Sequence, residues 1–279
     1  MAILLGLLAA ITWGTGDFTG GRAARYSPET TVVLLTEAIG LVLLLAAAPF
    51  VGGSPTGSDL LLGATAGFAG VAGLAVFYRG LADGRASVVA PIAAVGAAVL
   101  QVTWGLVGGE EPGALPLVGI VLALCAIGVV AGSAAEPVDI EAMDRMSEIR
   151  HGLLAAVGFG FYLILLSETS STAGLWTAVA TRAAPAVVLL LVLGLTRRPL
   201  LVPRVAAPLV AISGVTDASA NVLLLVALRT GLLSVVAPVA NLYPAVTIVL
   251  ARLFGHERIG RLRLLGLGLA LVSLVLISL

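Results

Sequence analysis

The sequence predicts an all-α integral membrane protein whose ten transmembrane helices form two inverted five-helix repeats. Three observations support this prediction: an apolar composition, ten long apolar segments and a pattern that recurs in each half. Hydrophobic residues make up 59% of the 279 residues and charged residues only 11%, whereas a soluble domain is about one-quarter charged. So little charge cannot cover a water-exposed surface, so we expect lipid around most of the chain.

Ten segments are long and apolar enough to cross a bilayer, which takes about 20 helical residues. In chain order they span residues 2–20, 30–50, 59–78, 87–107, 114–133, 151–168, 174–195, 205–228, 233–253 and 262–279. Glycine, proline or charged residues mark the connectors between them. The first segment has no basic start and no cleavage site, so we interpret it as a span and not as a signal peptide.

The two halves of the sequence share one register. Ser-Val-Val-Ala-Pro occurs at 87–91 and again at 234–238, and Glu110 and Glu257 follow at the same offset. We therefore assign residues 1–134 to the first repeat, 135–150 to a charged connector and 151–279 to the second repeat. Because five is odd, the second repeat enters the membrane upside down, which predicts a substrate site between the halves near the midplane.

Most arginines lie in or near the connectors that follow the first, third, fifth, seventh and ninth predicted segments. They are Arg22, Arg25, Arg79, Arg85, Arg145, Arg150, Arg197, Arg198, Arg204, Arg258, Arg261 and Arg263. Only Arg229 lies near a connector on the other side of the membrane. The positive-inside rule makes the arginine-rich side cytoplasmic and places both termini outside.

Several short motifs recur in the two halves. The first half has Trp13-Gly14, Tyr78 to Ala82 leading into Ser87 and Pro91, then Gly109-Glu110 and Gly119; the second has Ala227-Leu228, Ser234, Pro238, Gly255 to Glu257 and Gly266. In these residues the whole chain resembles the drug/metabolite transporter superfamily, in its form with two EamA repeats. The resemblance implies a ten-helix secondary transporter of small metabolites or drugs, often an exporter, without catalytic residues. Members usually have cytoplasmic termini, so the orientation stays open.

Four ionisable side chains lie inside the predicted spans: Asp17, Glu37, Arg182 and Asp217. Each costs about 2.5–3.5 kcal/mol in lipid and so needs a reason to be there. Glu37 and Arg182 occupy matching repeat positions, which inversion places roughly 10 Å apart along the membrane normal. They either bind opposite ends of a zwitterionic or anionic solute, with Arg182 as the anion contact, or form an ion pair with each other or with Asp217.

Asp217 and Asn221 share one face of the eighth predicted helix. The carboxyl of Asp217 either carries a proton during transport or hydrogen-bonds neighbouring helices. Asp17, near the end of the first helix, either joins the site or pairs with the arginines that follow it. Weaker site candidates, equally consistent with simple packing, are Gln101, Trp104, Asn241 and Tyr243.

Four prolines lie inside three of the predicted spans, some of them beside polar residues: Pro91, Pro185, Pro238 and Pro244. Each removes a backbone hydrogen bond and frees a carbonyl group. Irregular backbone is tolerated in a membrane where it lines a cavity. We therefore predict hinges in the wall of a central cavity; the alternative is that duplication copied prolines without a mechanical role.

The sequence disfavours several other classes of protein. It has no Walker pattern for ATP, its two histidines and single Cys125 form no metal-ligand cluster, and its net charge is zero. We expect no cofactor, metal or nucleic acid.

We therefore predict a multi-pass transporter of amino-acid-like or amphipathic solutes, working by alternating access. We expect it in a prokaryotic inner or plasma membrane, exporting its solute with coupling to protons, as a monomer or homodimer. The alternatives are a lipid-modifying membrane enzyme, disfavoured by scattered acids and connector histidines, and a nontransporting membrane scaffold.

Overall fold

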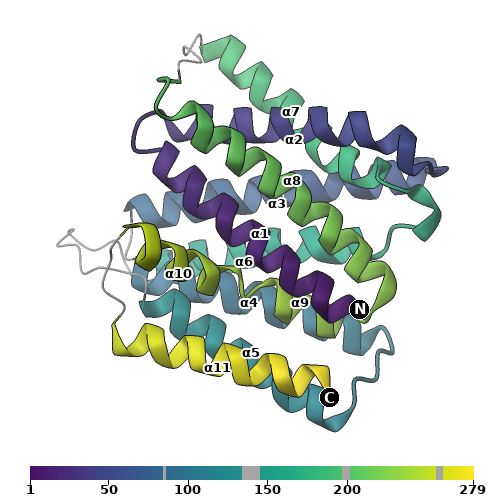
Figure 1. Ribbon diagram of the computed structural model, residues 1–279, viewed down its shortest axis with the longest axis vertical. Helices are drawn as coiled ribbons and strands as arrows, with labels where there is room; N and C mark the ends of the chain where they lie inside the picture. The colour runs from purple at the N-terminus through teal and green to yellow at the C-terminus, as the bar shows by residue number, and fades with distance from the viewer. Residues whose placement is uncertain (84–85, 134–144, 197–201, 256–259) are drawn as a thin grey trace.

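The protein is an all-helical bundle in the computed structural model, which describes residues 1–83, 86–133, 145–196, 202–255 and 260–279 (Figure 1). No strand occurs within these ranges. The helices are α1 (Ala2–Ala23), α2 (Glu29–Val51), α3 (Gly57–Asp83), α4 (Ala86–Val107), α5 (Ala114–Ser133), α6 (Arg145–Ser167), a 3₁₀ turn (Ser171–Ala173), α7 (Trp176–Thr196), α8 (Ala207–Thr230), α9 (Leu233–Ala240), α10 (Tyr243–Gly255) and α11 (Arg261–Ser278).

Five of the described helices are long and apolar enough to cross a membrane, namely α1, α2, α3, α6 and α8. Large apolar side chains also cover the outside of the bundle; Phe50 is 92% exposed and Val107 82% exposed. Such a surface is stable against lipid but not against water. The helices therefore build a multi-pass membrane protein.

Two predicted segments differ from the structure. The ninth span, 233–253, is not one helix but two, α9 and α10, with a break at Asn241 and Leu242. The sixth helix starts at Arg145, earlier than residue 151, so the end of the predicted charged connector is helical. The predicted start was too late because the apolar part of this helix begins after residue 151. The first turns of α6 are polar and so resembled a connector.

The inversion of the two repeats is visible in their contacts. A Cβ atom added to Gly67 of α3 would lie 2.1 Å from the carbonyl oxygen of Thr181 in α7. A Cβ atom added to Gly214 of α8 would lie 3.2 Å from the carbonyl oxygen of Thr36 in α2. These residues occupy matching repeat positions, so one glycine-mediated helix crossing occurs twice. The predicted fold class of two inverted five-helix repeats is confirmed.

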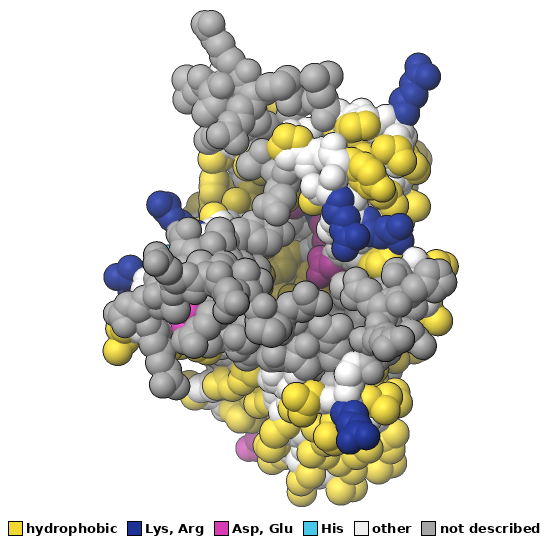
Figure 2. Space-filling model, turned by 90° about the vertical axis from the view of Figure 1, so that its left-hand side faces the viewer, with side chains coloured by type: hydrophobic (Ala, Val, Ile, Leu, Met, Phe, Trp, Pro, Cys, Tyr) yellow, Lys and Arg dark blue, Asp and Glu magenta, His cyan; other side chains and the backbone are white. Residues whose placement is uncertain are grey.

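The two ends of the bundle differ. Both termini lie at one end, which we call the termini face (Figure 1). Figure 2 looks at the opposite face, where arginine side chains stand around a central hollow and acidic side chains are visible in its wall. The face opposite the termini thus has a central hollow in which both acidic and apolar side chains are visible (Figure 2).

Candidate functional site

The charged side chains of the predicted spans meet inside the bundle. Arg182 of α7 donates a hydrogen bond from Nη1 to Glu37 Oε2 of α2 at 3.1 Å, and its Nη2 donates to Asp217 Oδ2 of α8. The Arg182 side chain is 4% exposed, whereas those of Glu37 and Asp217 are 20% and 25% exposed. Of the two alternatives from the sequence, the structure matches the ion pair, so Arg182 does not present an unoccupied guanidinium to an anionic solute.

Glycine provides the space for this guanidinium. A Cβ atom added to Gly40, one turn from Glu37 on α2, would lie 2.7 Å from Arg182 Nη1. On α7 itself, Pro185 has no amide hydrogen to donate to the carbonyl of Thr181, so the helix continues beside Arg182 with one backbone hydrogen bond fewer. The Nε of Arg182 is buried and has no hydrogen-bond partner. The charge is therefore held by its two carboxylates.

Asn221 extends the cluster along α8. Its Nδ2 donates to the backbone carbonyl of Asp217 at 2.8 Å, and its Oδ1 accepts a hydrogen bond from the hydroxyl of Tyr162 in α6. Asp217 and Asn221 thus share one helix face, as the sequence predicts. The hydrogen bond to Tyr162 ties that face to the first helix of the second repeat.

Asp17 lies next to this cluster without a described bond to it. The preceding residue, Gly16, packs against α8, where a Cβ atom added to it would lie 3.7 Å from the Cβ atom of Asp217. Ser213 also donates a hydrogen bond to the Gly16 carbonyl at 3.0 Å. Asp17 is exposed. One alternative from the sequence was that Asp17 pairs with the arginines that follow it. In the structure, Arg22 instead donates to the Phe254 carbonyl at 3.3 Å.

Gln101 and Asn241 form a separate hydrogen-bonded pair. The Asn241 side chain donates to Gln101 Oε1 at 2.7 Å and to the Ala237 carbonyl at 2.8 Å, and Gln101 donates to the Phe159 carbonyl at 3.1 Å. Gln101 is 0% exposed. The pair joins α4 to the break between α9 and α10, so its described contacts are structural.

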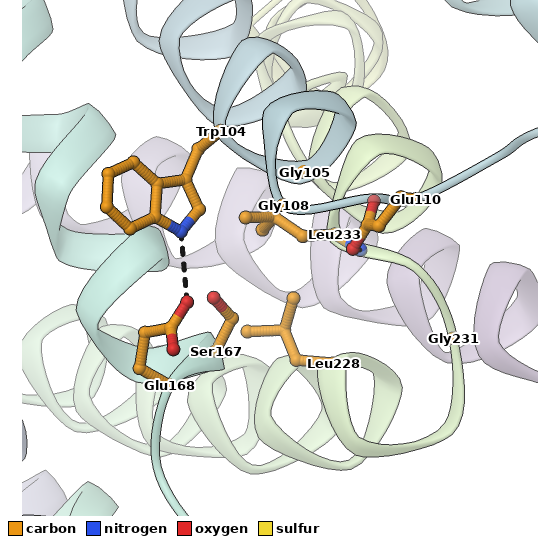
Figure 3. A pocket seen from close by; sticks show the side chains of 9 residues that line it. All are labelled: Trp104, Gly105, Gly108, Glu110, Ser167, Glu168, Leu228, Gly231 and Leu233. Atoms are coloured by element: carbon orange, nitrogen blue, oxygen red, sulfur yellow. Dashed lines mark hydrogen bonds between the residues drawn. The ribbon is translucent and has the colours of Figure 1, made fainter.

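The two aromatic candidates lie in different places. Tyr243 packs edge-on against Trp13, with ring centroids 6.0 Å apart. Trp104 lines a pocket of about 170 Å³ on the termini face and donates from Nε1 to Glu168 Oε1 at 2.9 Å (Figure 3). Neither belongs to the Arg182 cluster.

The predicted proline hinges are only partly visible. Pro185 and Pro238 lie inside the helices α7 and α9, and Pro244 is the second residue of α10. Pro91 lies in the continuous backbone of α4, and its side chain is outside the described residues. The break at Asn241 lies between Pro238 and Pro244, and α4 has no matching break, so the two halves are not symmetric here.

Three residues of the Arg182 cluster or the Trp104 pocket were not predicted as site residues from the sequence. Gly40 resembled ordinary packing glycines, and Glu168 and Glu110 lie at or beyond predicted helix ends, where charge is common. Glu110 occurs in the repeated Gly109-Glu110 motif, which was the available signal. Its contacts with another repeat depend on the tertiary fold.

The comparisons with known proteins agree with this architecture. The model of the EamA-like transporter family matches residues 1–132 and again residues 147–279. No curated protein matches the chain. A solved structure described as "Crystal structure of protein" is similar over 99% of this chain and 95% of its own, with a TM-score of 0.79 and 15% identity, which shows the fold alone. With two inverted repeats, each matched by the family model, the chain belongs to the EamA-like transporter family, whose members are membrane transporters of the drug/metabolite type and not enzymes.

Proposed function

We propose that the protein exports a small, amphipathic, amine-bearing solute, such as an amino-acid-like compound or a cationic drug, in exchange for protons. Transport proceeds by alternating access around the Arg182 cluster. The observation that supports this proposal is a surplus of accessible carboxyl groups. Asp17, Glu37 and Asp217 are at least partly exposed, while the nearby Arg182 is buried between two of them.

Charge balance favours a cation as the solute. Three carboxyl groups share one guanidinium, and an ionised carboxylate without a partner inside a membrane span is costly. Either protons or the ammonium group of a solute can balance the remaining negative charge, and the two then compete for the same carboxylates. Such competition is the basis of proton exchange, since loading the amine releases protons.

The location of the hollow favours export. It opens on the face where the arginines lie (Figure 2), and the positive-inside rule makes that face cytoplasmic. A solute in the cytoplasm can therefore reach the carboxyl groups first. Opening toward the termini face would then release it outside the cell.

Transport by purified protein tests the proposal. Proteoliposomes with an imposed pH gradient and no ATP are given labelled cationic drugs, neutral amino acids and organic anions. We expect pH-driven flux of amine-bearing compounds only. Asp217→Asn and Asp17→Asn should each lower it about tenfold or more, the effect of losing one interaction with a charged group.

Glu111→Gln is the matched control, because Glu111 is exposed and outside the cluster. It should leave the flux unchanged. Flux of organic anions, or equal flux without a pH gradient, would contradict the proposed solute and coupling. A folded protein that moves none of these compounds would favour the scaffold alternative.

A further inference from the structure

The pocket on the termini face lies where the two repeats meet. Trp104 belongs to α4 of the first repeat and Glu168 follows α6 of the second, and the bond between them lies at one side of the pocket (Figure 3). Ser167 and Leu228 line the same space. One side of the pocket therefore contains a contact between the two repeats.

Glu110 makes a second contact between the repeats. It lies in the connector after α4, and its Oε1 and Oε2 accept the backbone N–H groups of Leu233 and Ser234, each at 2.7 Å. These are the first residues of α9, whose N-terminus favours a negative charge. A Cβ atom added to Gly105 would lie 2.3 Å from Glu110 Oε2, so this glycine makes room for the carboxylate.

The pocket is aligned with the Arg182 cluster along α8. Asn221, Leu225 and Leu228 are spaced four and three residues apart and share one helix face. Asn221 belongs to the cluster, Leu225 is 0% exposed and Leu228 lines the pocket. This face of α8 thus runs from the charged cluster toward the termini face, with the buried Leu225 between them.

Other contacts also hold the termini face together. Asp59 at the start of α3 accepts hydrogen bonds from the backbone and hydroxyl of Ser170, at 2.7 and 2.9 Å. Arg229 at the end of α8 donates to the Gly174 carbonyl at 2.9 Å. The hollow opens on the opposite face (Figure 2). The structure is therefore closed on the termini face.

We infer that Glu110 and Glu168 are gating residues that close the solute path on the termini face, with the Trp104 pocket as the outer end of that path. This inference rests on the proposed alternating access. The moving element is α9, which has eight residues and ends at the break at Asn241. When the Glu110 contact opens, α9 swings at this break, and the bond between Trp104 and Glu168 parts.

A buried cysteine tests the gate without any solute. Leu225→Cys, in a full-length protein whose native cysteine is removed by Cys125→Ser, is labelled with a membrane-impermeant maleimide added from the termini face. Glu110→Gln leaves one α9 amide without an acceptor, and Gly105→Ala displaces the carboxylate. Each should raise the labelling rate about tenfold, as expected for the loss of one hydrogen bond to a charged group. Trp104→Phe, which keeps an aromatic ring but has no N–H group, should raise it as well.

Glu111→Gln is the matched control, with the same loss of charge at the adjacent residue, and should leave labelling unchanged. Size-exclusion chromatography identifies the variants that remain folded. Unchanged labelling in folded Glu110→Gln and Gly105→Ala would overturn the gate, and so would an equal increase in Glu111→Gln. Either result leaves the proposed function standing, because amine flux and its loss in Asp217→Asn are measured separately.

Discussion

Single glycines determine where this protein keeps its buried charges. Gly40 leaves room for the Arg182 guanidinium, and Gly105 leaves room for the Glu110 carboxylate. A buried charge is stable only when well-placed partners surround it. A methyl group at either position occupies part of the space of the charged group, so glycine here acts through its missing side chain and not through backbone freedom.

Gly40→Ala should therefore destabilise the protein by about 1–3 kcal/mol, as overpacking of a filled interior does. The guanidinium is the flexible end of a long side chain, but both of its carboxylate contacts fix it in place. Thermal unfolding in detergent, followed by the loss of monodisperse protein, measures the change. Gly21→Ala is the control, because a Cβ atom there meets nothing within 4 Å. A lower melting temperature for Gly21→Ala than for Gly40→Ala would refute the steric explanation.

For single residues, the sequence predicted which charged side chains form the cluster better than it predicted their contacts. Charged residues in apolar spans are few, so Glu37, Arg182 and Asp217 were identified by their cost in lipid. Their pairing stayed open because spacing along one helix says nothing about a partner on another. Asp17 shows the limit clearly: its neighbour Gly16 packs on α8, while Arg22 turns to α10.

The helices, too, were predicted where they depend on local sequence and not where they depend on tertiary contacts. Apolar length predicted most of the helices, since the bilayer sets the length of a spanning helix, but it predicted one helix where α9 and α10 stand. The break in the ninth span lies between two prolines, which the sequence marked as irregular. Its position at Asn241 depends on Gln101 in α4, a partner 140 residues away in sequence. The local sequence alone does not distinguish a break at Asn241 from a kink at Pro238.

The amide pair should therefore be thermodynamically coupled. Asn241→Leu leaves the buried Gln101 Oε1 without a donor, and Gln101→Leu removes the acceptor of Asn241, so each should cost about 1–3 kcal/mol. The double variant should cost less than the sum of the two, with a coupling of about 0.5–3 kcal/mol. Unfolding of all four proteins in the same detergent measures this cycle.

Ser219→Ala serves as the control partner in the same cycle. The Ser219 hydroxyl bonds only to the Val215 carbonyl of its own helix among the described contacts. Its effect should add to that of Asn241→Leu. Additivity in the Gln101 cycle as well would show that the amide pair does not hold the break.

The whole molecule follows from the odd number of helices in each repeat. Five helices return the chain to the other side of the membrane, so the second repeat is inverted. A register shared along both halves, which includes Ser87–Pro91 and Ser234–Pro238, predicted this. The asymmetry between the two faces was not predictable in the same way. The contacts that close the termini face, such as that of Glu110 with α9, join residues far apart in the sequence, so no local pattern predicts them.

Reporter cysteines test the inversion and the orientation together. In the Cys125→Ser background, Ser58→Cys marks the start of α3 and Val205→Cys the segment before α8; both positions are exposed. Inversion requires that an impermeant maleimide reaches them from opposite faces. The arginine-rich connectors are expected to stay in the cytoplasm, so intact cells should label Ser58→Cys, and Val205→Cys should be labelled only after permeabilisation. Labelling of both from one face would refute the inverted repeat. The reverse pattern would keep the inversion but place the hollow outside, and the proposed direction of transport would then be import.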